Sequence, residues 1–250
     1  MTDRPVAVDT TDDLFEILRG GERRGLALAE TLWRHLGPAR VDQRTLEVGV
    51  GAGVVASAVQ SDGRWVAGVD LSPVRLRRAS RRLMGAAARA DAQALPFPAG
   101  VFDAAYLVWL QLVPDRQVTA EVARVLRRGG RLVLVTGPHE AAAGDEVGAI
   151  ERRLAALHPW NERPADVALR NASQGLRLVS RSSWVLEVDQ SPSDAARGLE
   201  GRDLAGLWGL GKAEGDDAIA RATAALHALP EPDRPRRRRI AYPLLVFERA

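Results

Sequence analysis

The sequence predicts an α/β fold with a doubly wound, mostly parallel sheet whose two faces are covered by helices. The first observation is that short apolar runs alternate with helical patterns from Arg44 to Thr136, which is typical of βαβ units. The second is that the first apolar run enters the series Gly49, Gly51 and Gly53 just before a helix, as at the carboxyl end of a ligand-binding strand. The chain has 250 residues, 46% of them hydrophobic, which suits one large domain.

The chain contains no cysteine. This excludes disulfides, thiolate zinc sites, iron–sulfur clusters and cysteine nucleophiles, and it fits a reducing compartment. No apolar stretch reaches the roughly 18 residues that a membrane-spanning helix needs. Residues 1–11 carry acids and a proline in place of the apolar core of a secretory signal. We therefore expect a cytoplasmic protein.

The formal net charge is only +3, although the sequence pI is about 10.1. Lys212 is the only lysine among the 35 basic residues. Because arginine keeps its proton far above neutral pH, the titration curve crosses zero late and the pI is high. A surplus of this size produces a weak overall field, so a nucleic-acid partner is not implied.

Residues 1–36 are predicted to form an N-terminal helical flap, and residues 37–250 the main domain. A helical pattern over 11–36 is interrupted at Gly20-Gly21 and ends at Gly37-Pro38. In the first half of the main domain we expect strands over 45–50, 65–69, 88–90, 102–110 and 131–136, and helices over 54–60, 73–84 and 116–126.

The second half of the main domain has a less regular pattern. Here we expect strands over 176–179, 183–188 and 240–248, and helices over 199–210 and 216–229. Pro243 interrupts the last strand, which predicts that this strand lies at an edge of the sheet or carries a bulge.

The glycine series suits two kinds of ligand. Glycines allow a tight turn and a close approach of a ligand to the main chain, and the following helix offers free N–H groups. Gly51-x-Gly53-x-x-Ala56 with Asp70 on the next strand satisfies a loose dinucleotide pattern. However, Glu47 ends the first strand, where a carboxylate would repel a pyrophosphate but attract a cation. This residue favours a cationic nucleoside such as S-adenosylmethionine.

Five segments resemble, in order, the motifs of the class I S-adenosylmethionine-dependent methyltransferases. They are the glycine motif from Glu47 to Gly53, the second strand from Val66 to Ser72, Asp91-Ala92 with Leu95-Pro96-Phe97, Phe102-Asp103, and Leu126–Leu132. In the last segment Arg128 replaces the usual proline. The run from Gln111 to Asp115 resembles the small-molecule branch with quinone and natural-product methyltransferases, although the His-His pair common there is absent.

This resemblance implies a seven-stranded, Rossmann-like methyltransferase fold and S-adenosylmethionine as cofactor. It assigns cofactor binding to Glu47, Gly49, Gly51 and Gly53, with Gly51 beside the methionine part and Glu47 either facing the cation or holding the loop by hydrogen bonds. It further implies that Asp70 accepts from the ribose hydroxyls, that Asp91 accepts from the adenine amine, and that Leu71 and Ala92 enclose the purine. The sequence contains no compact cluster of hard-metal ligands, so no metal is expected.

The methyl acceptor is expected to be a small, fairly apolar metabolite methylated on oxygen, nitrogen or carbon. Segments 140–175 and 197–230 are expected to form a lid over it. His139 is the candidate general base, because it follows the fifth strand. Trp109, Gln111 and Trp160 are candidates for contact with the substrate.

Two arginine groups and two other functions remain open. The arginines of the helix predicted over 73–84 fit a solvated face. The run Arg236–Arg239 fits a solvated hairpin turn, or else a basic edge for an enzyme that methylates RNA or protein. The alternatives in another class are an NAD(P)-binding oxidoreductase and a cofactor-binding regulator without catalysis.

Overall fold

The computed structural model describes the whole chain except residues 1–20, 41, 109–115, 138–142, 158–163 and 201–211. The strands are β1 Arg44–Val48, β2 Trp65–Asp70, β3 Ala87–Arg89, β4 Phe102–Val108, β5 Leu126–Val135, β6 Leu176–Gln190 and β7 Arg236–Arg249. The helices are α2 Gly21–Leu36, α3 Val54–Gln60, α4 Pro73–Arg82, α5 Arg116–Val125, α6 Glu146–Ala155, α7 Pro164–Ala172, α8 Pro192–Glu200 and α9 Lys212–His227.

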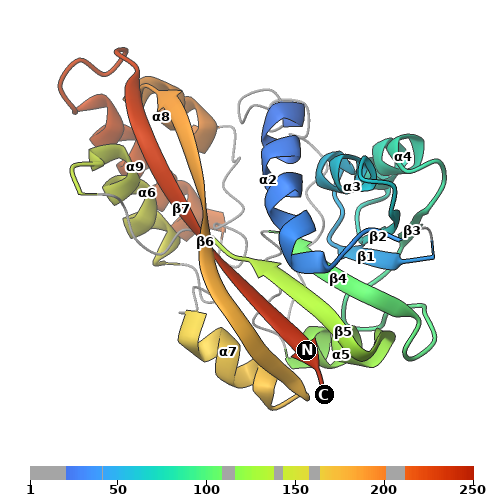
Figure 1. Ribbon diagram of the computed structural model, residues 1–250. Helices are drawn as coiled ribbons and strands as arrows, with labels where there is room; N and C mark the ends of the chain where they lie inside the picture. The colour runs from blue at the N-terminus through green and yellow to red at the C-terminus, as the bar shows by residue number, and fades with distance from the viewer. Residues whose placement is uncertain (1–20, 41, 109–115, 138–142, 158–163, 201–211) are drawn as a thin grey trace.

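The strands form one seven-stranded sheet in the order β3-β2-β1-β4-β5-β7-β6 (Figure 1). The pairs among β1 to β5 are parallel, whereas β7 is antiparallel to both β5 and β6. The predicted α/β fold with a mostly parallel sheet is confirmed. The strand order reverses between β1 and β4, so the loop after β1 lies where open α/β sheets bind ligands.

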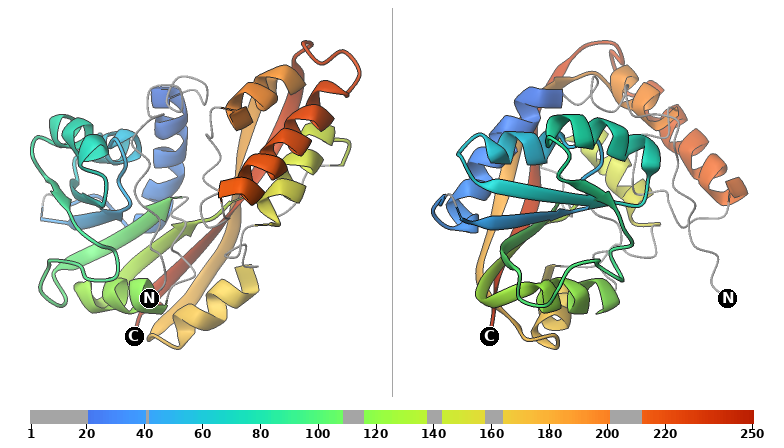
Figure 2. Two further views of the ribbon diagram at one scale, coloured as in Figure 1. Left: turned by 180° about the vertical axis from the view of Figure 1, so that it is seen from behind. Right: turned by 90° about the vertical axis from the view of Figure 1, so that its right-hand side faces the viewer.

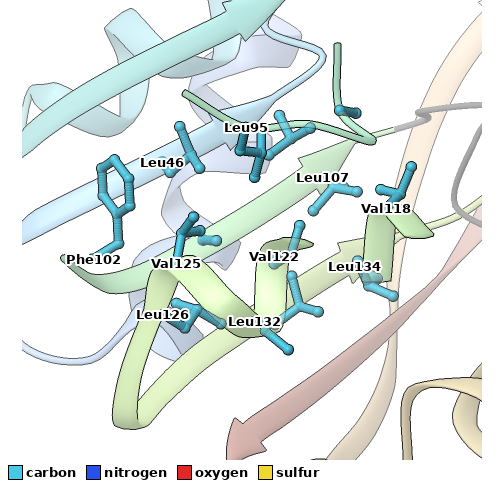
Figure 3. Packing of buried hydrophobic residues seen from close by; sticks show 14 of the residues in the cluster. Leu46, Leu95, Phe102, Leu107, Val118, Val122, Val125, Leu126, Leu132 and Leu134 are labelled. Atoms are coloured by element: carbon cyan, nitrogen blue, oxygen red, sulfur yellow. The ribbon is translucent and has the colours of Figure 1, made fainter. Parts of the chain in front are cut away.

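Helices cover both faces of the sheet, with α2, α3 and α4 on one face and α5 and α7 on the other (Figure 2). Under α5, the side chains of Phe102, Val122 and Leu132 belong to a continuous apolar cluster (Figure 3). On the opposite face, Leu28 and Leu32 of α2 are fully buried. The described part of the N-terminal segment is therefore a packed layer of the domain.

The β6–β7 pair continues past the carboxyl edge of the parallel strands as a two-stranded ribbon (Figure 1). The pairing of β5 with β7 ends at Val135 and Leu244, but β7 continues to Arg236, opposite Gln190. We call residues 184–190 with 236–242 the distal ribbon. Helices α6, α8 and α9, here called the helical lobe, lie beside it (Figure 1) and share a separate apolar cluster.

The expectation that the last strand lies at an edge or carries a bulge is wrong. Strand β7 lies between β5 and β6, and its register is regular around Pro243, which is opposite Ser183. The Pro243 carbonyl oxygen accepts from the Thr136 N–H at 3.0 Å. In a β-strand the N–H and the C=O of one residue point to the same side. The N–H group that proline lacks would therefore also point toward β5, at the position where β5 ends.

Several expected boundaries also need correction. The strands expected over 176–179 and 183–188 are one strand, β6, with a register shift between Leu178 and Ser180. Strand β5 begins at Leu126 rather than at residue 131. The helix expected to begin at residue 199 begins earlier, because α8 covers Pro192–Glu200, and the remainder of the expected range, 201–210, lies outside the described residues.

The run Arg236–Arg239 is part of strand β7 and not a solvated turn. The Arg238 side chain is buried, with its Nε 3.0 Å from Asp145 Oδ1 and its Nη2 2.7 Å from Glu151 Oε2. Arg236 pairs with Glu146 at 2.6 Å, and Arg237 pairs with Glu187 at 2.6 Å. Because carboxylates neutralise these arginines, they do not form the basic edge that a polyanion would need.

Candidate functional site

The glycine series forms a tight turn between β1 and α3. Gly49, Gly51 and Gly53 have φ angles of 78°, 54° and 82°, which favour glycine because a Cβ atom crowds this backbone region. The N–H groups of Gly49 and Val50 both donate to the Val69 carbonyl oxygen, at 2.8 and 2.9 Å. The neighbouring strand therefore holds the start of the turn at the carboxyl edge of the sheet.

Asp70 at the end of β2 holds the middle of the turn. Its Oδ2 accepts from the Gly51 N–H at 2.9 Å, and its Oδ1 accepts from the Ser72 N–H at 2.9 Å. Ser72 caps α4, with its Oγ accepting from the Arg75 N–H at 3.3 Å, and Pro73 is the first helical residue, where its missing N–H is harmless. Asp70 is thus a bridge between two loops rather than a helix cap.

Asp91 follows the end of β3 by two residues. One residue before it, the Ala90 N–H donates to the Asp70 carbonyl oxygen at 3.1 Å. The Asp91 Oδ1 accepts from the Gln93 N–H at 2.9 Å. The structure therefore places Asp70 and Asp91 in neighbouring loops at the same edge of the sheet, as the sequence predicts.

Glu47 lies beneath the glycine turn and is 2% exposed. Its Oε2 accepts from the Tyr106 hydroxyl at 3.0 Å. Burial raises the pKa of Glu47 to about 8, and the nearby Asp70 charge raises it further, while hydrogen bonds from Tyr106 and the Ala56 N–H oppose the shift. A carboxyl group with this pKa carries a proton at neutral pH.

The residues at this edge fit a cationic nucleoside better than a phosphate. A Cβ atom built on Gly51 meets no atom of the described residues within 4 Å, so a ligand has open space to approach the turn at this position. Asp70 and Asp91 supply acceptors for hydroxyl and amino groups, which a pyrophosphate cannot use. In the described part of the chain, no group of His, Asp and Glu side chains could hold a metal ion.

The remaining predicted site residues have different surroundings. Leu71 is 42% exposed, so it is available to a ligand, whereas Ala92 is buried in the main apolar cluster. His139, Trp109, Gln111 and Trp160 lie outside the described residues.

The sequence analysis did not identify Tyr106, or Tyr242 as the partner of Trp184 in the distal ribbon. Tyr106 is opposite Glu47 in the register of β1 and β4, a relation that only the strand order reveals. Trp184 and Tyr242 stack with ring centroids 5.3 Å apart, just beyond the end of β5. The available signal was that both residues lie in short apolar runs that are expected to form strands.

The comparisons with known proteins agree with this geometry. A family model described as a methyltransferase domain matches residues 46–134. A phosphatidylethanolamine N-methyltransferase of Cereibacter sphaeroides is 33% identical over 144 residues, which cover 54% of this chain and 70% of that protein. A demethylmenaquinone methyltransferase of Tropheryma whipplei is 36% identical over 102 residues, which cover 39% of this chain and 43% of that protein.

The first matched relatives are uncharacterized proteins of Mycobacterium bovis and Mycobacterium tuberculosis, 37% identical over 138 residues, and the chain spans only 50% of their length. Among solved structures, the geranyl diphosphate C-methyltransferase of Streptomyces coelicolor A3(2), in complex with Mg2+, geranyl diphosphate and S-adenosyl-L-homocysteine, has a TM-score of 0.58 at 20% identity. That match covers 99% of this chain and 88% of the other, so the two share a fold.

Proposed function

This chain belongs to the class I S-adenosylmethionine-dependent methyltransferases, and on that premise we propose that it methylates an oxygen, nitrogen or carbon atom of a small, fairly apolar metabolite. S-adenosylmethionine is the cofactor of this family. The observation that carries the proposal is the glycine turn held by Asp70, with open space above Gly51 and buried Glu47 below. The matched enzymes from Cereibacter and Tropheryma are named for small-molecule acceptors.

The cofactor supplies an activated methyl group on a sulfonium ion, and S-adenosylhomocysteine is the product after transfer. The protein's task is to align the acceptor atom, the methyl carbon and the sulfur, which provides much of the rate. We assign the ribose hydroxyls to Asp70 and the adenine amine to Asp91. Leu71, which is exposed, would contact the purine, whereas the Ala92 side chain is buried in the apolar cluster and is not assigned this contact. Gly49, Gly51 and Gly53 would let the methionine part approach the backbone.

The acceptor side is assigned to the distal ribbon and the helical lobe. The ribbon extends past the carboxyl edge of β5, and Trp184 and Tyr242 lie on it at that edge. The lobe lies beside the ribbon and includes described parts of the predicted lid segments 140–175 and 197–230, whereas α7 packs on the α5 face. None of the helices among the described residues could cross a membrane.

The proposed chemistry is tested with S-adenosylmethionine carrying a labelled methyl group and a panel of acceptors. The panel contains prenylated phenols, quinols and amines, with total RNA and a protein extract as competitors. Label is expected in the small, apolar acceptors. Label found only in RNA or protein would contradict the proposed acceptor class. Replacement of His139 by alanine then tests whether a general base is needed for those acceptors that must lose a proton.

Asp70→Ala is expected to weaken S-adenosylmethionine binding by about 1–3 kcal/mol, the scale for losing hydrogen bonds to a charged group. Isothermal titration calorimetry measures this change. Asp103→Ala is the matched control, because Asp103 also accepts from a backbone N–H, that of Arg44 at 2.9 Å, but at the start of β4 on the opposite edge. Equal affinities of the two variants for S-adenosylmethionine would contradict the assignment of Asp70 to the cofactor site.

The same substitution at two glycines separates ligand binding from folding. Gly51→Leu is expected to abolish cofactor binding, because the side chain enters the open space, at a stability cost of about 1–2 kcal/mol for the left-handed backbone. Gly53→Leu is expected to cost more stability, because its Cβ would lie 2.9 Å from the Ala79 Cα. Urea unfolding and calorimetry on both variants check the two effects, and a Gly51→Leu variant that still binds the cofactor would contradict this placement.

A further inference from the structure

Glu47 and Tyr106 form a buried polar pair in the middle of the sheet. They lie on the neighbouring strands β1 and β4, opposite each other in the register. Glu47 is 2% exposed and Tyr106 is 0% exposed, and the hydroxyl donates to Glu47 Oε2 at 3.0 Å. A buried carboxyl group without a cation beside it is rare, because the ionised form is poorly solvated there.

The groups that face Glu47 come from three elements. Tyr106 on β4 donates its hydroxyl hydrogen, Ala56 on α3 donates its backbone N–H, and Asp70 on β2 contributes a negative charge. Among the described residues no arginine, lysine or histidine contributes to the electrostatics of Glu47. The strongest influence is burial, which raises the pKa of Glu47 to about 8, so the free protein holds a proton on this group at pH 7.

Tyr106 keeps its own proton. Burial and the neighbouring Glu47 raise the pKa of Tyr106 well above its ordinary value, and only the charge of Arg64 opposes this. The hydroxyl is therefore a permanent donor, and its hydrogen bond stabilises the carboxylate more than the carboxylic acid. Tyr106 thus makes Glu47 easier to ionise and holds its Oε2 in one place.

We propose that Tyr106 is a positioning residue for cofactor binding, and that Glu47, held by Tyr106 beneath the glycine turn, releases its proton to solvent when the cationic cofactor binds above the turn. This inference rests on the proposed function. The positive charge of the cofactor is the partner that the buried carboxyl group otherwise lacks. In this step the O–H bond of Glu47 breaks and the proton is transferred to the buffer. Binding energy is thereby linked to pH through one group.

The linkage has a definite direction. Below a pH of about 8 the cofactor must displace the Glu47 proton, so the affinity is expected to rise almost tenfold per pH unit and to level off above that value. At pH 7 close to one proton should be released per cofactor bound. Tyr106→Phe removes a hydrogen bond to the carboxylate, so it should weaken binding about tenfold at pH 7 and move the plateau up by about one pH unit.

The first experiment is calorimetry of S-adenosylmethionine binding from pH 6 to pH 9.5. Proton release is compared between pH 7 and pH 8 in phosphate and in Tris, whose ionisation enthalpies differ. The proton release of the wild type, Tyr106→Phe and Glu47→Gln is compared. Glu47→Gln keeps an acceptor for Tyr106 but cannot titrate, so it records the pH dependence of the cofactor's own amino group. The wild type is expected to release about one proton more than Glu47→Gln at pH 7, and Tyr106→Phe to shift the pH profile upward.

The second experiment needs no cofactor. In protein labelled with ¹³C at glutamate carboxyl groups, the resonance missing from Glu47→Gln identifies Glu47, and its titration in the free protein is expected to have a midpoint near 8. In Tyr106→Phe the midpoint should be higher. This shift separates positioning from a purely structural role, because loss of packing alone would not move it in that direction.

The outcomes are distinct. The inference is overturned if the pKa of Glu47 in the free protein lies near the ordinary glutamate value of 4.5, if cofactor binding releases no more protons than in Glu47→Gln, or if Tyr106→Phe keeps the wild-type pH profile. If the wild type binds no S-adenosylmethionine at any pH, the proposed function itself is wrong, and this inference with it.

Discussion

Replacing Arg238 with alanine is expected to destabilise the chain by about 3–5 kcal/mol, the cost of leaving a buried carboxylate without its cation. The side chains of Arg238 and Asp145 are 3% and 8% exposed. Glu151 on α6 is the second carboxylate, 2.7 Å from Arg238 Nη2. Asp145 also caps α6, with its Oδ1 accepting from the Gly148 N–H at 2.8 Å. One arginine therefore joins the distal ribbon to the start of the helical lobe.

Urea unfolding measures the loss, and hydrogen exchange in α6 and α9 locates it. Arg237→Ala is the matched control, because Arg237 is the next residue on β7 and pairs with Glu187 on the exposed face, where its side chain is 76% exposed. This control should have little effect, since exposed ion pairs contribute little to stability. Equal unfolding curves for the two variants would contradict the role assigned to Arg238.

The second large effect concerns the pH dependence of stability through Glu47. The pKa of Glu47 is about 8 in the folded chain, against 4.5 for an unperturbed glutamate such as that of the unfolded chain, so the folded state binds the proton more tightly. This contribution to stability is fully present below pH 4.5 and is lost as the pH rises through 8. Since one pKa unit is worth about 1.4 kcal/mol, the wild type should lose roughly 4 kcal/mol between pH 5 and pH 9 relative to Glu47→Gln.

Denaturant unfolding at several pH values tests this loss in protein free of cofactor. Glu121→Gln supplies a control of opposite sign, because the hydrogen bond from Arg124 holds the pKa of Glu121 below its ordinary value. The contribution of Glu121 to stability is present above pH 4.5, the ordinary glutamate pKa, and is lost as the pH falls through the lowered pKa of Glu121 in the folded chain. If the free energy of unfolding of the wild type did not fall relative to Glu47→Gln up to pH 9, Glu47 would ionise without destabilising the folded chain, and the prediction would be contradicted.

The first half of the fold could be predicted because its information is local. Each parallel strand from β1 to β4 is a short apolar run, and the glycine turn and Pro73 mark where helices begin. Glu47, Asp70 and Asp91 were found because each stands at or near the end of such a run. In a parallel sheet these ends share one edge, so the candidate cofactor site followed from the strand pattern.

The second half could not be predicted, because its structure depends on partners far away in the chain. Pro243 suggests an edge strand, but the sheet accommodates it where β5 ends. Arg238 looks like part of a solvated run, but Asp145, 93 residues earlier, lies within hydrogen-bond distance. Tyr106 resembles an ordinary core residue until the strand order places it against Glu47. These features are properties of tertiary pairing rather than of local pattern.

A crystal structure of the chain with S-adenosylhomocysteine tests the central claim most directly. The account predicts the adenosine between Asp70 and Asp91, with the amino acid part of the ligand above Gly51 and Glu47 below it. A ligand bound at another place, or the three carboxyl groups facing no common cavity, would contradict the account.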